Sequence, residues 1–155
     1  MADIDFTGIT NFNYDDSRFS EENPDFVNQI GRASFYDAST GAINLTMRGR
    51  LSDIVATHFI SGLPFIGVAN EPDPDFAMVD IKNQLIVSRP VMSINLNGNI
   101  LSGVPIGAEI YIDGQFYRAE DGEIELITRP GAAVMISVHH WPFVDWRGEY
   151  ANSEA

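Results

Sequence analysis

The sequence of 155 residues predicts a mainly β protein with an N-terminal extended arm, a small β-hairpin region and a C-terminal Ig-like β-sandwich. Three observations lead to this prediction. Apolar residues alternate with polar ones over short runs, turn-forming residues recur about every 8 to 12 positions, and the composition includes 13 Gly and 8 Pro. The boundaries that we expect are 1–32 for the arm, 33–90 for a β-hairpin attachment region, 91–148 for the sandwich and 149–155 for a polar tail.

The arm is an outlier in composition. The first 30 residues hold seven acidic residues and one arginine, a net charge of −6, and their aromatic residues follow neither a helical nor a strand period. Exposed rings carry a hydrophobic cost, so we expect this segment to dock on a neighbouring surface. A disordered, solubilising tail is the alternative. The anchors of a docked arm would be its aromatic residues, Phe6, Phe12, Tyr14, Phe19 and Phe26.

The region that follows begins with a predicted hairpin over residues 34–47. Apolar residues alternate with small or polar ones in its second strand. The loop D-A-S-T-G between the two strands has a turn mechanism, because the Asp37 carboxylate can accept hydrogen bonds from turn amides and Gly41 can adopt a positive φ.

A short helix, an irregular segment and a second hairpin complete this region. The spacing of one helix face is found at Leu51, Ile54, Val55, His58 and Phe59. Ser52 or Asp53 is a candidate N-cap for that helix. Residues 62–74 hold several glycines and prolines, which predict a loop or an edge strand. Residues 76–81 and 84–88 are expected to pair as a hairpin.

Residues 91–146 are the most regular part of the sequence. Asn97-Gly98 predicts a hairpin with a type I′ turn, and a further turn is expected at Gly114. About six short strands fit into this stretch, which indicates a small sandwich of the immunoglobulin type. The Cys pair and the central Trp of antibody domains are absent from it.

Composition and charge exclude several classes of function. Nine basic against 22 acidic residues give a net charge of −13, which repels phosphate backbones and anionic membrane surfaces, so we expect no nucleic-acid partner. The sequence contains no Cys, hence no disulfide and no thiolate metal site. It shows no signal-peptide pattern at its start and no run of about 18 apolar residues, so we expect a soluble, unsecreted protein without membrane insertion.

The chain also lacks a recognisable catalytic or metal-binding pattern. His139 and His140 are adjacent, so strand alternation would point their side chains to opposite faces, and His58 lies far away in the sequence. Ser137 shares the face of His139 but has no identifiable acid or oxyanion hole. No P-loop or dinucleotide fingerprint is present. We therefore predict no catalytic residue, no metal, no cofactor and no enzymatic activity.

Two clusters leave alternatives open. The densest group of carboxylates is found at Glu71, Asp73 and Asp75, in a Pro-rich stretch that reads as a solvated, rigid turn, with a bound calcium ion as the alternative. The second group is aromatic and comprises Trp141, Phe143 and Trp146. These rings are expected to cap the core of the sandwich, and otherwise to pack against a protein partner or to stack on a sugar.

Several stretches resemble small structural proteins of tailed bacteriophages. They are F-Y-D-A-S-T-G-A-I at 35–43, V-D-I-K-N-Q-L-I-V-S-R-P at 79–90, L-S-G-V-P-I-G-A-E-I-Y-I-D-G-Q-F-Y at 101–117 and H-W-P-F-V-D-W at 140–146. In those proteins a Tyr-Asp-x-x-Thr-Gly hairpin precedes an Arg-Pro junction and an Ig-like domain ending in Pro-Tyr-Leu-Asp or similar. Here Pro142-Phe143-Val144-Asp145 holds that place, and the resemblance covers residues 34–146.

The resemblance implies a virion structural protein, made in the host cytoplasm, that acts by protein–protein docking. A tail fibre or tail-tip component is the first hypothesis, with other virion proteins as partners, a homo-oligomer such as a trimer, and a host-surface glycan as a further contact. A capsid decoration or neck protein is the alternative in the same class. A carbohydrate-binding module that uses Trp141 and Trp146 is the alternative from another class.

Overall fold

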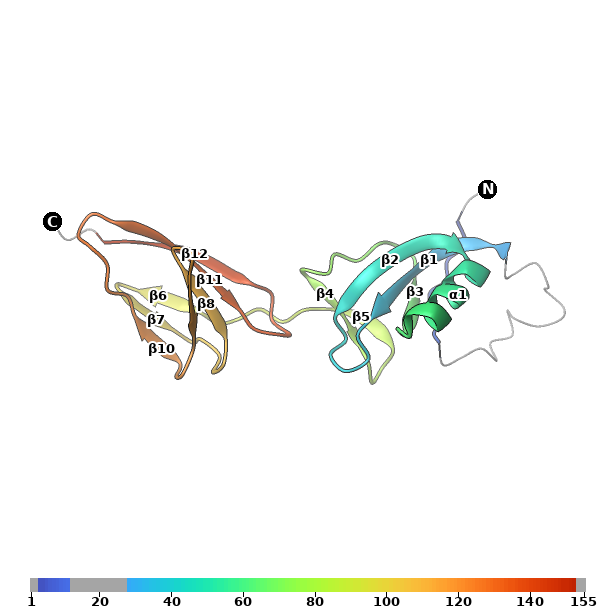
Figure 1. Ribbon diagram of the computed structural model, residues 1–155, viewed down its shortest axis with the longest axis horizontal. Coiled ribbons are helices and arrows are strands. Elements are labelled where there is room, and N and C mark those ends of the chain that lie inside the picture. Colours follow the sequence, from blue (N-terminus) through green and yellow to red (C-terminus); the bar gives the residue numbers. More distant parts are fainter. Residues whose placement is uncertain (1–2, 12–27, 153–155) are drawn as a thin grey trace. The chain divides into compact units, whose positions relative to one another are not determined.

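The chain forms two compact units. The computed structural model describes residues 3–11 and 28–152, and the contacts divide the chain into Met1–Ser88, here unit 1, and Arg89–Ala155, here unit 2 (Figure 1). Antiparallel strands dominate both units, as the sequence predicts, and one helix is present among the described residues.

Unit 1 is built on a three-stranded antiparallel sheet in the order β2-β1-β3. Its elements are β1 (Ile30–Tyr36), β2 (Ile43–Arg50), α1 (Leu51–Ser61), β3 (Phe65–Val68), β4 (Ala77–Asp80) and β5 (Leu85–Ser88). The hairpin β4-β5 forms a separate two-stranded sheet. Both predicted hairpins and the short helix are therefore confirmed, and residues 65–68 of the irregular segment form an edge strand.

The alternation of side chains along β1 gives the sheet two buried faces. Phe35 packs with Leu51 and Ile54 of the helix, whereas Tyr36 packs with Val79 of the β4-β5 hairpin. The sheet is thus covered by α1 on one face and by the hairpin on the other.

Two local features of unit 1 can be compared directly with the sequence. The predicted turn is confirmed, because the Asp37 carboxylate accepts hydrogen bonds from the amides of Ser39 and Thr40, at 2.8 and 3.1 Å, and Gly41 has φ 80°. The predicted helix cap is wrong. Arg50 occupies the N-cap position without a side-chain cap, because α1 continues directly from β2.

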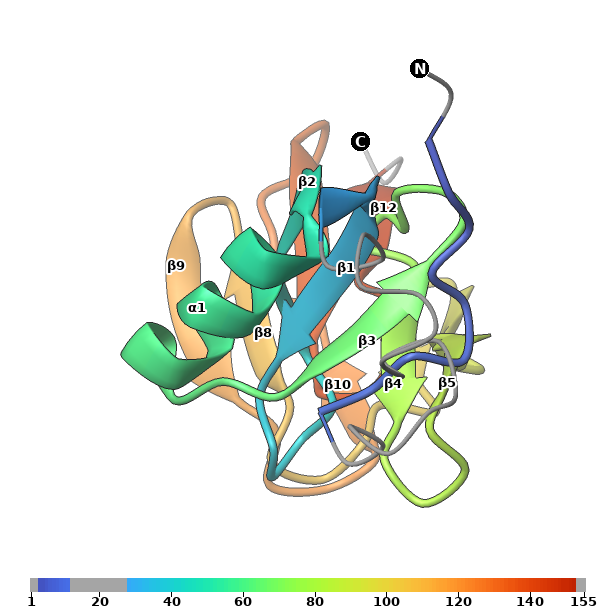
Figure 2. The same ribbon diagram turned by 90° about the vertical axis from the view of Figure 1, so that its right-hand side faces the viewer.

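The first described segment, residues 3–11, belongs to unit 1. Phe6 and Ile9 are fully buried in its core, and Thr10 forms an antiparallel bridge with Ile66 of β3. Figure 2 shows this segment running beside β3. This part of the predicted arm therefore lies on a neighbouring surface, but that surface is the protein's own sheet, whose core is completed by Phe6 and Ile9. The other four predicted anchors, Phe12, Tyr14, Phe19 and Phe26, lie outside the described residues.

Two glycines make the space that Phe6 occupies. A Cβ at Gly31 would overlap the ring of Phe6, and a Cβ at Gly67 would collide with the Phe6 carbonyl oxygen. The start of the segment is fixed by Asp3, whose carboxylate accepts hydrogen bonds from Nε and Nη2 of Arg48 at 2.8 and 2.7 Å. The close packing of Phe6 and the ion pair of Asp3 with Arg48 therefore both hold residues 3–11 on the sheet.

In residues 89–152, unit 2 is a seven-stranded β-sandwich with the immunoglobulin topology. Its strands are β6 (Asn95–Asn97), β7 (Ile100–Ser102), β8 (Glu109–Ile112), β9 (Gln115–Arg118), β10 (Glu123–Glu125), β11 (Ala133–His139) and β12 (Trp146–Ala151). One sheet has the order β10-β7-β6 and the other the order β12-β11-β8-β9. These orders correspond to strands E-B-A and G-F-C-C′ of Ig-like domains, so the predicted fold class is confirmed.

The core of unit 2 lies between these sheets and includes Leu101, Ile110, Ile136 and Val138. The predicted polar tail from residue 149 is wrong, because β12 extends to Ala151 and pairs with β11 along its whole length. The strand period is present there, with Trp146 and Tyr150 packed against the core.

The predicted type I′ turn at Asn97-Gly98 is also wrong. The β6-β7 register places Gly98 and Asn99 in the loop, and only Gly98 has a positive φ, which is the pattern of a type II′ turn. Among the described residues, no helix is long and apolar enough to cross a membrane.

Phe6→Ala is expected to lower the free energy of unfolding of unit 1 by about 3–5 kcal/mol, because it empties a fully buried slot. Far-UV circular dichroism during a urea titration measures this loss. Trp141 and Trp146 are the two tryptophans and belong to unit 2, so Trp fluorescence should keep its midpoint. Phe59→Ala removes a ring that is 72% exposed and should cost under about 0.5 kcal/mol. Equal stability of the Phe6→Ala and Phe59→Ala variants would contradict the placement of residues 3–11 in this core.

Asp3→Asn is expected to make unit 1 less sensitive to acid. The hydrogen bonds and charge of Arg48, with the charge of Arg32, lower the pKa of Asp3. A carboxylate with a lowered folded-state pKa contributes stability above its unfolded pKa, about 3.9, and loses it as pH falls through the folded pKa.

Thermal unfolding followed by circular dichroism from about pH 6 to pH 2 tests this expectation. Wild type should lose more stability than Asp3→Asn, and Arg48→Ala should reduce the pH dependence in the same way. Identical acid slopes for wild type and Asp3→Asn would show that the ion pair makes no contribution.

Candidate interaction site

The outer face of the four-stranded sheet in unit 2 presents a row of aromatic and apolar side chains. Tyr111 of β8 lies opposite Phe116 of β9, with ring centroids 5.4 Å apart. Met135 of β11 lies on the same sheet and is 59% exposed, and the Phe116 side chain is 49% exposed. Rings held on a rigid sheet lose little conformational entropy when a partner covers them, so this row is suited to protein contact.

Charged groups border the aromatic row at one end of the sheet. The guanidinium of Arg118 lies over the Phe116 ring, 5.7 Å from its centroid, and is 3.7 Å from the carboxylate of Glu109. His139 packs edge-on against Tyr111, and its Nδ1 is 2.8 Å from an Asp145 oxygen. Arg118 and His139 at this border therefore each have a carboxylate partner.

Arg89 holds the turn that follows β11. Its Nε donates to the Pro142 carbonyl at 3.0 Å, and its Nη2 donates to the Phe143 carbonyl. The same guanidinium lies 4.8 Å from the centroid of the Trp141 ring. The amide of Val144 donates to the Pro90 carbonyl at 2.8 Å. The predicted Arg-Pro junction is thus part of unit 2, and it fixes the segment that carries Trp141.

A polar depression of about 490 Å³ lies at this end of the sandwich. It is lined by Arg89, Gly107, Glu109, Arg118, His139, His140, Trp141 and Asp145. Two arginines, two carboxylates and two histidines can donate or accept hydrogen bonds there, and the indole supplies an apolar surface. The depression can therefore bind a polar group of a ligand or partner.

The three predicted surface aromatics have different environments. Trp141 is 37% exposed and lines the depression. Phe143 and Trp146 instead pack against the core of unit 2, in agreement with the core-capping interpretation of the sequence. A platform that needs both tryptophans is therefore not present, and Trp141 is the ring of this group that a ligand can reach.

The residues considered for catalysis do not form a connected constellation. His139 has an acidic partner in Asp145, but within residues 28–152 no hydrogen bond joins Ser137 to His139. His58 belongs to unit 1, where its Nδ1 is 2.7 Å from the Leu63 carbonyl oxygen. The described part of the chain holds no group of three or more His, Cys, Asp or Glu side chains arranged to bind a metal ion.

The acidic loop of unit 1 uses its oxygens within the loop. The Asp73 carboxylate accepts a hydrogen bond from the Asp75 amide at 2.9 Å, and the Asp73 carbonyl accepts from the amides of Phe76 and Ala77. Glu71 is exposed. This geometry is that of a rigid, solvated turn.

Of the contacts at this site, that of Arg89 could not be predicted from the sequence, whereas that of Phe116 with Tyr111 had a local signal. Arg89 lies 53 residues before its acceptor Pro142. The aromatic row arises only when β8 and β9 pair in the observed register. The available signal was local: Tyr111 and Phe116 lie at mirrored positions around the Asp113-Gly114 turn, so a two-residue hairpin loop places them opposite each other.

Comparisons with known proteins give little further information. No family model matches this sequence, and no curated protein matches it. A solved structure of the 47-kilodalton lipoprotein Tp47 of Treponema pallidum is 15% identical, with a TM-score of 0.30. The match covers 79% of this chain and 40% of the lipoprotein, so the chain spans less than half of that protein. A TM-score this low assigns neither a fold family nor a function.

Arg89→Ala is expected to lower the stability of unit 2 by about 1.5–3 kcal/mol, because the turn loses charge-assisted hydrogen bonds to two carbonyls. Trp fluorescence in urea measures the midpoint, and the emission maximum should shift because Trp141 loses the overlying cation. Arg129→Ala, at an exposed position, is the matched control and should leave both quantities unchanged. An Arg89 variant with the midpoint of the control would contradict this role.

Proposed function

We propose that this chain is a structural component of a tailed-phage virion, at the tail fibre or tail tip, and that it works by protein–protein docking. The observation that carries the proposal is the aromatic row of unit 2, with Tyr111, Phe116 and Met135 on the outer face of a rigid sheet. Partly exposed apolar side chains that lie together on one face are typical of protein contact sites.

The residues behind the phage resemblance support this proposal through their structural roles. The Asp37 turn closes the first hairpin, and Arg89 with Pro90 fixes the turn that carries Pro142. These are folding and packing positions. The proposed setting is therefore a particle in which copies of the chain act together, with a homo-oligomer multiplying modest contacts.

A capsid decoration or neck protein would use the same docking face. Copy number distinguishes the two locations, because a decoration protein is present in hundreds of copies and a tail component in few.

A carbohydrate-binding function is the second candidate, and it is favoured by the exposed ring of Trp141 beside the polar depression. An indole face can stack on a sugar, and the surrounding charges can bind its hydroxyl groups. This function predicts glycan binding by the isolated chain that Trp141→Ala abolishes without a change in thermal stability. It is compatible with a host-surface contact of a tail protein.

If the proposal holds, the genome that encodes this chain yields tailed particles, and mass spectrometry of those purified particles is the direct test. We expect the chain in a fixed copy number, and Tyr111→Ser/Phe116→Ser should reduce its incorporation at least about tenfold because the docking face loses both rings. Phe59→Ser/Ile60→Ser, which removes exposed apolar side chains from unit 1, is the matched control.

The outcomes separate the two parts of the proposal. Particles without the chain would contradict a virion function altogether. Particles that contain the chain but incorporate the double variant of Tyr111 and Phe116 normally would contradict the docking face while leaving the virion function in place. Circular dichroism of each variant must first match wild type, so that loss of incorporation reports a lost contact.

A further inference from the structure

A groove of about 540 Å³ lies on one side of the sandwich of unit 2. Its lining comes from β8, β9 and β10, from the loop between β9 and β10, and from the residues that follow β10. β9 and β10 are the edge strands of the two sheets, so the groove opens where the sandwich is not closed by a further strand. It is separate from the polar depression and shares only Arg118 with that site.

The floor of the groove is apolar. Ile110 and Leu126 are core residues that reach it, and Ile112 and Ile124 pack on the same core from partly buried positions. Ile127 lies at the groove with 89% of its side-chain surface exposed. An aliphatic side chain of a partner that entered the groove would remove this surface from water, at about 25 cal/mol per Å² of apolar area.

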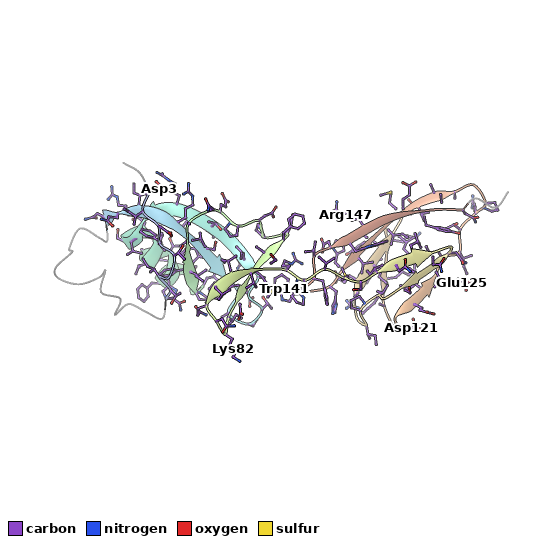
Figure 3. All side chains as sticks on the ribbon, turned by 180° about the vertical axis from the view of Figure 1, so that it is seen from behind. Asp3, Lys82, Asp121, Glu125, Trp141 and Arg147 are labelled. Atoms are coloured by element: carbon purple, nitrogen blue, oxygen red, sulfur yellow. The ribbon has the colours of Figure 1, made fainter. Side chains whose placement is uncertain are left out.

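The rim of the groove is acidic. Its four carboxylates belong to Glu120, Asp121, Glu123 and Glu125. Arg118 is the basic residue of the lining, but its guanidinium is engaged by Glu109, at 3.7 Å, and by the Gly107 carbonyl, at 3.2 Å. Figure 3 labels Asp121 and Glu125 on this part of unit 2. The rim therefore has an excess of negative charge around an apolar floor.

The two edge strands provide backbone groups for pairing. In the described part of the chain, β10 pairs with β7 on one side, β9 pairs with β8 on one side, and neither strand has a neighbour on the other side. An exposed edge can accept an extended segment of another chain through main-chain hydrogen bonds, with alternate side chains entering a groove.

The charge of the rim decides which segment fits. A second copy of β10 would bring Glu123 and Glu125 against the same two carboxylates, and like charges directly opposite each other are destabilising. A nucleic acid or an acidic peptide is repelled for the same reason. A segment in which basic residues alternate with aliphatic ones matches both the rim and the floor.

We propose that this groove binds an extended, basic and aliphatic segment of a partner protein, which adds to the edge of the sandwich with its aliphatic side chains over Ile124 and Ile127 and its cations at the carboxylate rim. This inference concerns a surface different from the aromatic row. It holds or fails independently of whether the chain is a virion component.

The experiment uses the full chain and an eight-residue peptide of alternating Lys and Val as the probe. Isothermal titration calorimetry measures the affinity, and NMR chemical-shift changes should concentrate at residues 117–128. We expect Glu123→Lys/Glu125→Lys to weaken binding at least about tenfold, because two attractive charges become repulsive. Ile127→Ser should weaken it by a smaller factor, because it removes an exposed apolar contact and leaves the charges intact.

Two controls separate a specific site from the general attraction between a basic peptide and an acidic protein. Glu71→Lys/Glu149→Lys makes the same change in net charge at exposed positions outside the groove and should retain the affinity of wild type. A peptide of alternating Lys and Ser carries the same charge without aliphatic side chains and should bind at least about tenfold more weakly.

Several results would overturn the proposal. They are no binding of the Lys and Val peptide, equal weakening by the groove variant and by the control variant, or shift changes centred on another surface. Tighter binding of a peptide of alternating Glu and Val would show that the groove prefers an acidic segment. Self-association of the chain through β10 would show that the groove is occupied by a second copy of this chain. If no peptide binds, the carboxylates serve only to protect the edge strands from aggregation.

Discussion

Both units contain small sheets, and few residues are available to bury the apolar faces of each sheet. This shortage of covering residues determines the structure of both units. The sheet of unit 1 has three strands, and residues from Phe6 to Thr10 are needed to complete its helix-side core and to pair with β3. The sandwich of unit 2 buries the inner faces of two sheets against each other but leaves the side between β9 and β10 open. Other molecules can bind where a unit leaves apolar surface exposed.

The aromatic row of unit 2 lies on the outer face of its four-stranded sheet because the inner face is buried in the core. The inner positions of β8 and β11 are occupied by Ile110, Ile136 and Val138, so the alternate positions project outward. Tyr111 and Met135 occupy such outward positions. The contact of Tyr111 with Phe116 contributes to the stability of the sheet, and the apolar surface that stays exposed beside it is available to a partner.

The sequence predicted those features that depend on near neighbours. The hairpins and the sandwich follow from period-2 runs and from turn residues such as Asp37 and Gly41, whose partners lie within a few positions. The helix follows from apolar residues spaced three and four positions apart. The place of Phe6 could not be predicted, because its slot is made by Gly31 and Gly67, which are distant in the sequence. Arg89 lies more than 50 residues before Pro142, the acceptor of its hydrogen bond in the turn after β11. No pattern in the sequence indicates such a distant pair.

Contact of unit 2 with other proteins can be measured by hydrogen–deuterium exchange of the chain, free and in particles of the proposed virion. We expect slower exchange in the particle for amides of β8, β9 and β11, which lie beneath Tyr111, Phe116 and Met135. Unchanged exchange throughout unit 2, with protection confined to unit 1, would contradict this contact.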